Sequence, residues 1–244
     1  MMSDNETVLT MKQSIDEMIY SSVTIEGIAA TFAQTKEIIE TGTATGMSQE
    51  SINKILNIKR AWEYLFTKYR DEPSWDTYSD YNRLIGEGCV KDAGLLRPPN
   101  SVMVGTGGQD PYIPPPVSGE DDFNRILDTA KDSFADIDDA AAALFLMLCR
   151  AQFFHDGNKR SAQLLVNHLL AHVDAGYILC VPQEKRDDLL NILVDYYTGV
   201  LSLDDAEFDT YDLVIRKADA ALVAKEPMRA GESQDVSRGH TRGR

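Results

Sequence analysis

The residues best suited to chemistry lie in one short run, QFFHDGNKRSAQ, at positions 152–163. It places a carboxylate, an amide and two adjacent cations where an apolar helical stripe begins: Asp156, Asn158, Lys159 and Arg160. Cations in the first turn of a helix oppose the positive end of the helix dipole unless an anion lies between them. Asp156 beside such an anion would be repelled unless a divalent cation bridges the two. The run therefore predicts a phosphate and Mg²⁺ site at a helix N-terminus.

The same run resembles the signature loop of the Fic (Fido) family, H-x-F-x-D/E-G-N-G/K-R, which is usually followed by a second arginine three residues on. Six positions match without a gap: Phe154, Asp156, Gly157, Asn158, Lys159 and Arg160. Gly157 suits a turn in which the backbone approaches a phosphate closely. Two positions depart, because Gln152 replaces the family's histidine and Gln163 replaces the second arginine.

The resemblance implies an all-α fold, the Fic/Fido helical bundle with a small β-hairpin flap. It also implies a nucleotide site for ATP and Mg²⁺ and transfer of AMP to a Ser, Thr or Tyr hydroxyl of a target protein. By the same resemblance, the positions of Gln152, Asp156 and Arg160 are expected to carry the catalytic roles, and Asp156 is expected to bind the metal. The nucleotide phosphates are expected at Gly157, Asn158, Lys159, Arg160 and Gln163.

Gln152 weakens the catalytic expectation. The family's histidine takes the proton from the target hydroxyl, and such general-base assistance is worth about 10²–10⁴ in rate. An amide cannot accept that proton, so the transferase is expected to be weakened or inactive. Three alternatives stay open: phosphate transfer as in the Doc-like branch, which shares the lysine of Lys159; a non-catalytic nucleotide-binding regulator; and removal of AMP from modified proteins.

A second segment bears on regulation. Residues 21–27, SSVTIEG, resemble the inhibitory S/T-x-x-x-E-G/N motif of Fic proteins that are inhibited by their own N-terminal helix. Ser22, Glu26 and Gly27 fall on the marked positions. In the family this glutamate pairs with the second arginine. Here Glu26 is expected either to hydrogen-bond to Gln163 or to pair with Arg160, and in some Fic proteins it positions water to remove AMP.

Residues 95–116 resemble the flap that lies over the Fic loop. Val102, Val104 and Ile113 favour strands around a glycine-rich turn at 105–108, and the prolines at 114–116 prevent a longer ladder. An unpaired hairpin edge can receive an extended target segment by strand addition. Three flap residues are expected to contact nucleotide or target: Gly107, Gly108 and Tyr112.

Composition limits the remaining choices. With 244 residues and a net charge of −15, the chain is large enough for one sizeable core and is poorly suited to binding nucleic acid. The three cysteines match no metal spacing and are expected to be reduced and buried in a cytoplasmic protein: Cys89, Cys149 and Cys180. No membrane span is expected, because the longest apolar run, 140–149, is short. The oligomeric state stays open.

Periodicity predicts a mostly helical chain in three parts: an N-terminal inhibitory segment (1–27), a core (28–225) and a disordered tail (226–244). The expected helices cover 11–21, 28–39, 48–69, 75–87, 122–134, 138–153, 161–173, 183–200 and 204–223. His155 is expected to face solvent and not to serve as the missing base. His168 is expected to pack within its helix.

Overall fold

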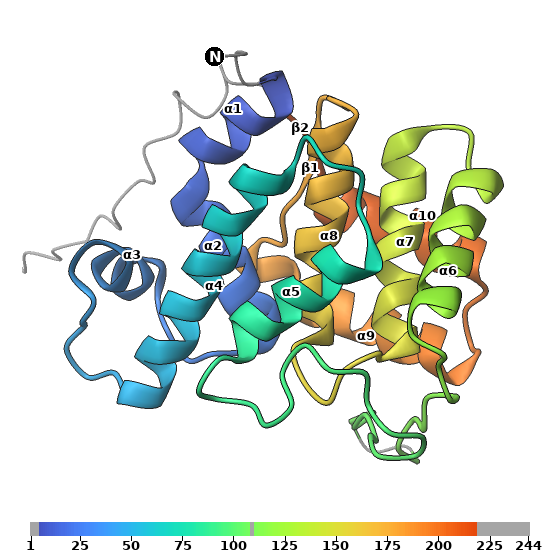
Figure 1. The fold of residues 1–244 in the computed structure, drawn as a ribbon, viewed down its shortest axis with the longest axis horizontal. Helices are drawn as coiled ribbons and strands as arrows, with labels where there is room; N and C mark the ends of the chain where they lie inside the picture. Colours follow the sequence, from blue (N-terminus) through green and yellow to red (C-terminus); the bar gives the residue numbers. More distant parts are fainter. Residues whose placement is uncertain (1–4, 108–109, 219–244) are drawn as a thin grey trace, which may run out of the picture.

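The computed structural model describes residues 5–107 and 110–218, and within them it confirms the helical fold class. The elements follow one another as shown in Figure 1. The first half contains α1 (Glu6–Gln13), α2 (Ile15–Glu26), α3 (Phe32–Thr41), α4 (Gln49–Lys68) and α5 (Trp75–Gly86). The second half contains α6 (Glu120–Ser133), α7 (Ile137–Ala151), α8 (Asn158–His172), β1 (Tyr177–Leu179), η1 (Gln183–Lys185), α9 (Arg186–Thr198), α10 (Leu203–Val214) and β2 (Ile215–Lys217).

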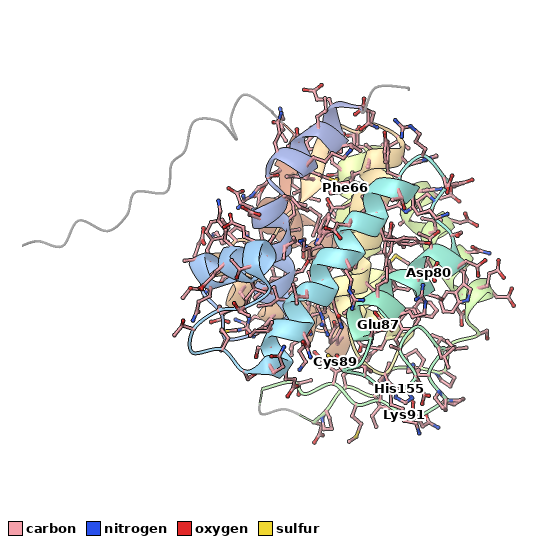
Figure 2. The ribbon with its side chains drawn as sticks, turned by 60° about the vertical axis from the view of Figure 1, so that its left-hand side comes forward. Phe66, Asp80, Glu87, Cys89, Lys91 and His155 are labelled. Atoms are coloured by element: carbon pink, nitrogen blue, oxygen red, sulfur yellow. The ribbon has the colours of Figure 1, made fainter. Side chains whose placement is uncertain are left out.

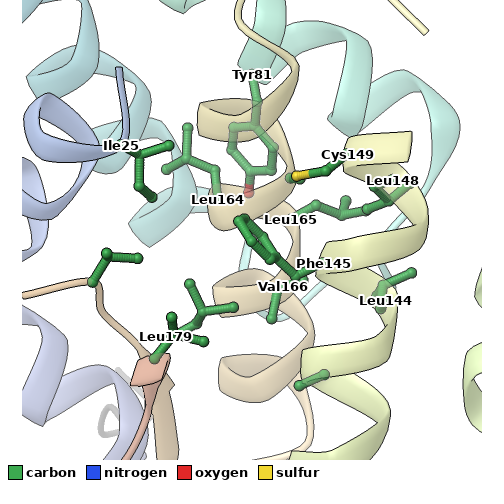
Figure 3. Close-up of a cluster of buried hydrophobic side chains, with 14 of the residues drawn as sticks. Ile25, Tyr81, Leu144, Phe145, Leu148, Cys149, Leu164, Leu165, Val166 and Leu179 are labelled. Atoms are coloured by element: carbon green, nitrogen blue, oxygen red, sulfur yellow. The ribbon is translucent and has the colours of Figure 1, made fainter. Parts of the chain in front are cut away.

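Helices α7 and α8 form the centre of the fold. Helix α7 packs against α6, α8, α9 and α10, whereas α8 packs against α2, α4 and α5. Figure 3 shows buried side chains around these helices: Phe145 and Leu148 belong to α7, and Leu164, from α8, lies beside Ile25 of α2. These side chains are buried because α7 is mostly apolar and because α8 is enclosed by α2, α4, α5 and α7. The loop that joins α7 to α8 therefore starts and ends on rigid, buried helices.

His168 lies in this core, as the sequence predicted, and is fully buried. Its Nδ1 is 2.9 Å from the hydroxyl of Tyr81, and its Nε2 is 2.9 Å from the backbone oxygen of Asp71. Burial is the main cause that lowers the pKa of His168. The residue is a packed histidine and lies outside the candidate site.

The N-terminal segment is two helices instead of the single helix expected at 11–21. The Asn5 side chain accepts a hydrogen bond from the backbone N–H of Val8 and so caps α1, which breaks from α2 at Ser14. Helix α2 ends at Gly27, which has a left-handed backbone conformation (φ 73°) that glycine adopts without strain. Helix α2 packs against α4 and α8, which places its last residue beside the loop before α8.

A small antiparallel sheet of β1 and β2 was not predicted. Tyr177, Ile178 and Leu179 pair with Lys217, Arg216 and Ile215, respectively. The helix expected at 204–223 ends at Val214 because the chain turns there to pair with β1; residues 219–223 lie outside the described residues. The helix expected at 183–200 starts later, since 183–185 form a 3₁₀ turn before α9.

The flap is less regular than the sequence predicted. Its described part holds one antiparallel bridge, in which Val104 and Tyr112 exchange two backbone hydrogen bonds of 2.9 Å. Neither Val102 nor Ile113 lies in a strand. The prolines on the returning side, Pro111 and Pro114 among them, lack the N–H groups that a longer ladder needs.

Among the described helices, none combines the length and the apolar character needed to cross a lipid bilayer. The tail expected at 226–244 lies outside the described residues. The cysteines are free thiols, of which Cys149 and Cys180 are buried as predicted. Cys89 is only partly buried, because it lies in the loop after α5 and not in the core.

Glu207 gives the fold a testable pH dependence. It is buried on α10 with one carboxylate oxygen unpartnered, and burial is the main cause that raises its pKa to about 7, with the carboxylates of Asp139, Asp204 and Asp138 adding to the rise. The pKa of Glu207 in the folded state lies above its unfolded value of about 4.3. The stability that its proton contributes is therefore fully present below about pH 4.3 and is lost as the pH rises through 7.

We therefore expect Glu207→Gln to raise the free energy of unfolding by about 1 kcal/mol at pH 8, which is about 2–4 °C in Tm. At pH 4 its melting temperature should match that of the unmodified chain. Calorimetric melting at both pH values checks this, with Glu37→Gln on the exposed face of α3 as the control. An equal shift at pH 4 and pH 8 would show that the effect is not protonation.

Candidate functional site

The end of α7 presents Gln152 to the loop. Gln152 has a left-handed backbone conformation (φ 49°) and is only 7% exposed. Its side-chain Nε2 donates a 2.5 Å hydrogen bond to the backbone oxygen of Cys149, and its Oε1 accepts one of 3.0 Å from Asn158 Nδ2. The amide is thus held at both ends, and neither end can accept a proton from a substrate hydroxyl.

Asn158 closes the loop on itself. Its Oδ1 accepts a 2.9 Å hydrogen bond from the backbone N–H of Phe154, and its Nδ2 donates to the Phe154 backbone oxygen (2.8 Å) as well as to Gln152. Phe154 anchors the loop from below, since its ring packs against Trp75 and Tyr78. Asn158 therefore shapes the loop, and its amide points inward in the observed conformation.

Asp156 and Gly157 form the outer bend of the loop. The side chain of Asp156 is half-exposed, and its Oδ1 accepts a 2.6 Å hydrogen bond from the backbone N–H of Gly157. Gly157 has φ 78°, and a Cβ at this position would lie 3.0 Å from Asn82 Nδ2. Asn82 also donates 2.7 Å and 3.1 Å hydrogen bonds to the Asp156 backbone oxygen and the Ser161 hydroxyl. Asn82 was not identified from the sequence, because nothing local links α5 to this loop.

Arg160 joins the loop before α8 to the C-terminal end of α2. Its side chain is 2% exposed, and its Nη2 lies 2.9 Å from Glu26 Oε1 and 3.5 Å from Asp156 Oδ1. Lys159 lies next to it, half-buried, in the first turn of α8 as predicted. Of the two partners expected for Glu26, the structure has Arg160. The carboxylate of Glu26 therefore lies where an external anion would meet the arginine.

The electrostatic surroundings of Glu26 are mixed. Burial is the largest influence and raises the pKa of Glu26; Arg160 acts against this rise, and the nearby charge of Asp156 adds to it. Lys159 and Lys54 also favour the ionised carboxylate. Glu26 is thus a mostly buried carboxyl group that is paired with Arg160 near the N-terminus of α8 and lies close enough to Asp156 to be affected by its charge.

Gln163 does not reach this cluster. It is fully buried, and its amide accepts a 2.6 Å hydrogen bond from the Ser22 hydroxyl and donates one of 2.7 Å to Ser21 Oγ. Trp62 Nε1 donates to Ser22 (3.1 Å), and the backbone N–H of Val181 donates to Ser21 (2.7 Å). The amide of Gln163 thus fastens α2 to α8 instead of facing a ligand, and Ser22 belongs to this fastening.

Arg97, which the sequence did not indicate, ties the flap to the loop. It is 2% exposed. Its guanidinium donates to the backbone oxygens of Pro115 (2.6 Å), Ala151 (3.4 Å) and Gln152, and its own N–H donates to Phe153 (2.9 Å). The guanidinium also lies at the C-terminal end of α7, where the negative end of the helix dipole stabilises a cation.

Two cavities meet beneath the flap. The smaller, about 220 Å³, is lined by residues of the loop, Glu26 and the flap, and the larger, about 750 Å³, lies between the flap and α9. They share Val104, Gly105 and Lys159. His155 is exposed, as predicted, and borders the smaller cavity at the loop end of the molecule (Figure 2).

The flap residues take different positions. Gly107 lines the larger cavity, whereas Tyr112 lines neither. The Tyr112 hydroxyl donates a 3.1 Å hydrogen bond to the Arg150 backbone oxygen, and its ring stacks on Tyr197 with centroids 5.1 Å apart. Tyr112 therefore supports the flap from beneath. Gly108 lies outside the described residues.

The residues at the loop fit a magnesium ion held jointly with a substrate. Over the described ranges, no group of three or more His, Cys, Asp or Glu side chains is placed to bind a metal. Mg²⁺ does not need such a group, because it keeps several waters and binds one or two carboxylates together with substrate phosphates. The half-exposed carboxylate of Asp156 beside Arg160 supplies that kind of single ligand.

Comparison with known proteins agrees with these features. No family model matches the chain. The proteins named protein adenylyltransferase Fic from Drosophila sechellia and Drosophila melanogaster are each 31% identical to it over 194 residues, 75% of this chain. The chain spans 37% of the length of these relatives.

Solved structures show the same fold. A Fic domain-containing signaling protein from Bacteroides thetaiotaomicron matches with a TM-score of 0.66 at 22% identity, over 85% of this chain and 84% of that protein. Fic-1 from C. elegans matches with a TM-score of 0.68 at 22% identity, over 84% of this chain and 62% of that one. Fold and site together define a helical protein with a cationic loop, at the N-terminus of α8, beneath a flap. The chain carries a domain of the Fic (Fido) family.

Proposed function

We propose that this domain binds ATP with Mg²⁺ and belongs to a protein adenylyltransferase that is inhibited by Glu26 and weakened by Gln152. The observation that carries the proposal is the ion pair of Glu26 and Arg160 at the anion-binding end of the cavities. A carboxylate that occupies a cationic helix N-terminus competes directly with a phosphate for the same donors.

The two cavities suit a nucleoside triphosphate. The phosphates belong in the smaller one, next to the α8 N-terminus and Arg160. The nucleoside belongs in the larger one, between the flap and apolar residues of α9 such as Leu193 and Val194. Lys159 lines both cavities, which supports a role in contacting phosphates near their junction. Mg²⁺, held by Asp156 and the phosphates, would neutralise charge on the nucleotide.

In the proposed reaction, the target hydroxyl oxygen bonds to the α-phosphorus of ATP, the bond to the β-phosphate oxygen breaks, and diphosphate leaves. The hydroxyl proton must go to a base as the new bond forms. Gln152 occupies the position of the base, and its side-chain amide hydrogen-bonds to the Cys149 backbone oxygen and to Asn158. The target protein is proposed to dock as an added strand on the flap, whose described part forms only one bridge.

A second candidate is a non-catalytic regulator that keeps the nucleotide site, and the held amide of Gln152 favours it. It shares the binding step with the transferase and differs only in the transfer of label from ATP. Phosphate transfer moves the γ-phosphate of ATP to the target, and AMP removal releases AMP from a modified protein. Labelling ATP at the α- or the γ-phosphate, or labelling the AMP of a modified protein, therefore separates these reactions from AMP transfer.

Binding of ATP tests the step that both candidates share. We expect Glu26→Gly to raise the affinity for ATP–Mg²⁺ by about 5- to 150-fold over the unmodified chain, because the competing carboxylate is removed. Isothermal titration calorimetry measures this. Glu26→Gln removes the charge but keeps a residue with high helix propensity, and it should also raise the affinity for ATP–Mg²⁺.

Glu40→Gly is the matched control, since Glu40 also lies at the end of a helix (α3) and is exposed. It should leave ATP affinity unchanged. The proposal fails if none of the Glu26 variants binds ATP–Mg²⁺, or if Glu40→Gly tightens binding as much as Glu26→Gly does.

A further inference from the structure

The C-terminal end of α2 is held by a side chain from a distant helix. Arg186, the first residue of α9, donates a 2.9 Å hydrogen bond from Nε to the backbone oxygen of Thr24. Thr24 lies in the last turn of α2, two residues before Glu26, and the same oxygen accepts the 3.0 Å cap bond from the Gly27 N–H. A cation at this end of a helix also meets the negative end of the dipole. Arg186 therefore stabilises the turn that carries Glu26.

The guanidinium of Arg186 fits closely on the end of α2. A Cβ at Gly27 would lie 2.7 Å from Arg186 Nη2, so the glycine leaves the space that the arginine fills. Arg186 also pairs with Asp187, its neighbour in the sequence, at 2.8 Å. Asp187 is 86% exposed, and surface pairs of this kind contribute little. The hydrogen bond to Thr24 is therefore the contact of Arg186 that matters for α2.

The connection between α9 and α2 is narrow. The body of α9 packs against α7 and α10, and its residues Leu193 and Val194 line the larger cavity beneath the flap. A separate cavity of about 250 Å³, lined by Arg186, Gln183 and the end of α2, lies beside the hydrogen bond to Thr24. Arg186 thus ties α2 to a helix that is fixed elsewhere, and the cavity gives its side chain room to move away.

The position of Glu26 depends on this last turn. Its carboxylate reaches Arg160 at 2.9 Å from the final residue of α2. Ser21 and Ser22 fasten the preceding turn to Gln163. Because helix ends fray, opening of residues 24–27 would carry Glu26 away from Arg160 while the rest of α2 stayed in place. The hydrogen bond from Arg186 acts against that opening.

We propose that Arg186 is a positioning residue for inhibition: it holds the last turn of α2 so that the Glu26 carboxylate stays on Arg160. Loss of the hydrogen bond to Thr24 lets the turn open and frees Arg160 for a phosphate. The inference rests on the proposed function, because it assumes that a nucleotide competes with Glu26. It places part of the control of the site at the start of α9, outside the two cavities beneath the flap.

Calorimetric titration with ATP–Mg²⁺ in two backgrounds tests the inference. In the otherwise unmodified chain, Arg186→Met should raise the affinity about three- to tenfold, because a charged but partly exposed hydrogen bond is lost from the inhibited state. In the Glu26→Gly background the same substitution should leave the affinity unchanged, since the competing carboxylate is already gone. Arg186→Lys keeps a charged donor and should give a smaller rise. Asp187→Asn, the matched control, leaves the hydrogen bond to Thr24 in place and should not change the affinity.

Hydrogen exchange reports on the same turn without nucleotide. The backbone amides of Gly27 and Ile28 donate to the oxygens of Thr24 and Val23, and they should exchange about three- to tenfold faster in Arg186→Met.

The inference is overturned if Arg186→Met leaves the ATP affinity of the otherwise unmodified chain unchanged. It is also overturned if the substitution changes the affinity equally in both backgrounds, because the effect would then lie in α9 itself. Absence of ATP binding to Glu26→Gly would instead reject the proposed function. In that case faster exchange in Arg186→Met still supports the hold on α2, and unchanged exchange overturns it.

Discussion

Replacing Gln152 with histidine in the Glu26→Gly background should raise the rate of AMP transfer by about 10²–10⁴-fold over Glu26→Gly alone. The imidazole of histidine accepts a proton near neutral pH, which the amide cannot do. The left-handed backbone at Gln152 and the hydrogen bonds between Asn158 and the Phe154 backbone do not depend on the side chain at position 152, so the new ring starts from a closed loop. Measurement uses α-labelled ATP with a cell lysate as the source of targets.

Two variants define what the result means. Gln152→Asn should give no increase, because it keeps an amide. His155→Gln, added to the Gln152→His variant, should leave the labelling high, since His155 is exposed at the mouth of the cavity. Labelling that depends on His155 and not on position 152 would place the base elsewhere. Labelling from γ-labelled ATP alone would replace AMP transfer with phosphate transfer.

Much of the loop was predictable because its signals are local. The polar run at 156–160 directly precedes an apolar helical stripe, so the helix start and the two cations in its first turn follow from sequence order alone. Helices α4 and α5 were likewise predicted from the periodicity of their apolar residues, and the structure shows that Ser48 and Ser74 cap them. The fold class then followed from the resemblance that these residues carry.

What the sequence left open depends on contacts between distant segments. Glu26 had two equally plausible partners, and only the packing of α2 on α8 brings it to Arg160. The same packing buries Gln163 among serines, where motif position alone suggested a phosphate contact. The strands β1 and β2 are three residues each, too short for a periodic signal, and they pair across 36 or more residues.

Arg97→Met should produce the largest loss of stability among the surroundings of the site, about 3 kcal/mol in the free energy of unfolding. The substitution removes the donor for three backbone oxygens, on Pro115, Ala151 and Gln152, at the buried end of α7. A methionine fills much of the same volume but donates no hydrogen bond. Thermal and denaturant unfolding measure the change, and Arg83→Met, which affects only an exposed pair with Asp80, should have little effect.

A purely structural role for Arg97 predicts equal losses in every function, whereas a positioning role does not. Arg97 fixes the base of the flap relative to Gln152, and a small misplacement of reacting groups can cost about 10²-fold in rate. In the Glu26→Gly, Gln152→His background, Arg97→Met should therefore lower AMP transfer about 100-fold at a temperature where the variant is folded, while ATP affinity changes only a few-fold. Arg97→Lys, which keeps the charge but not the fork of donors, should be intermediate. If ATP binding and transfer fall in parallel, Arg97 supports the fold and does not position the flap for the target.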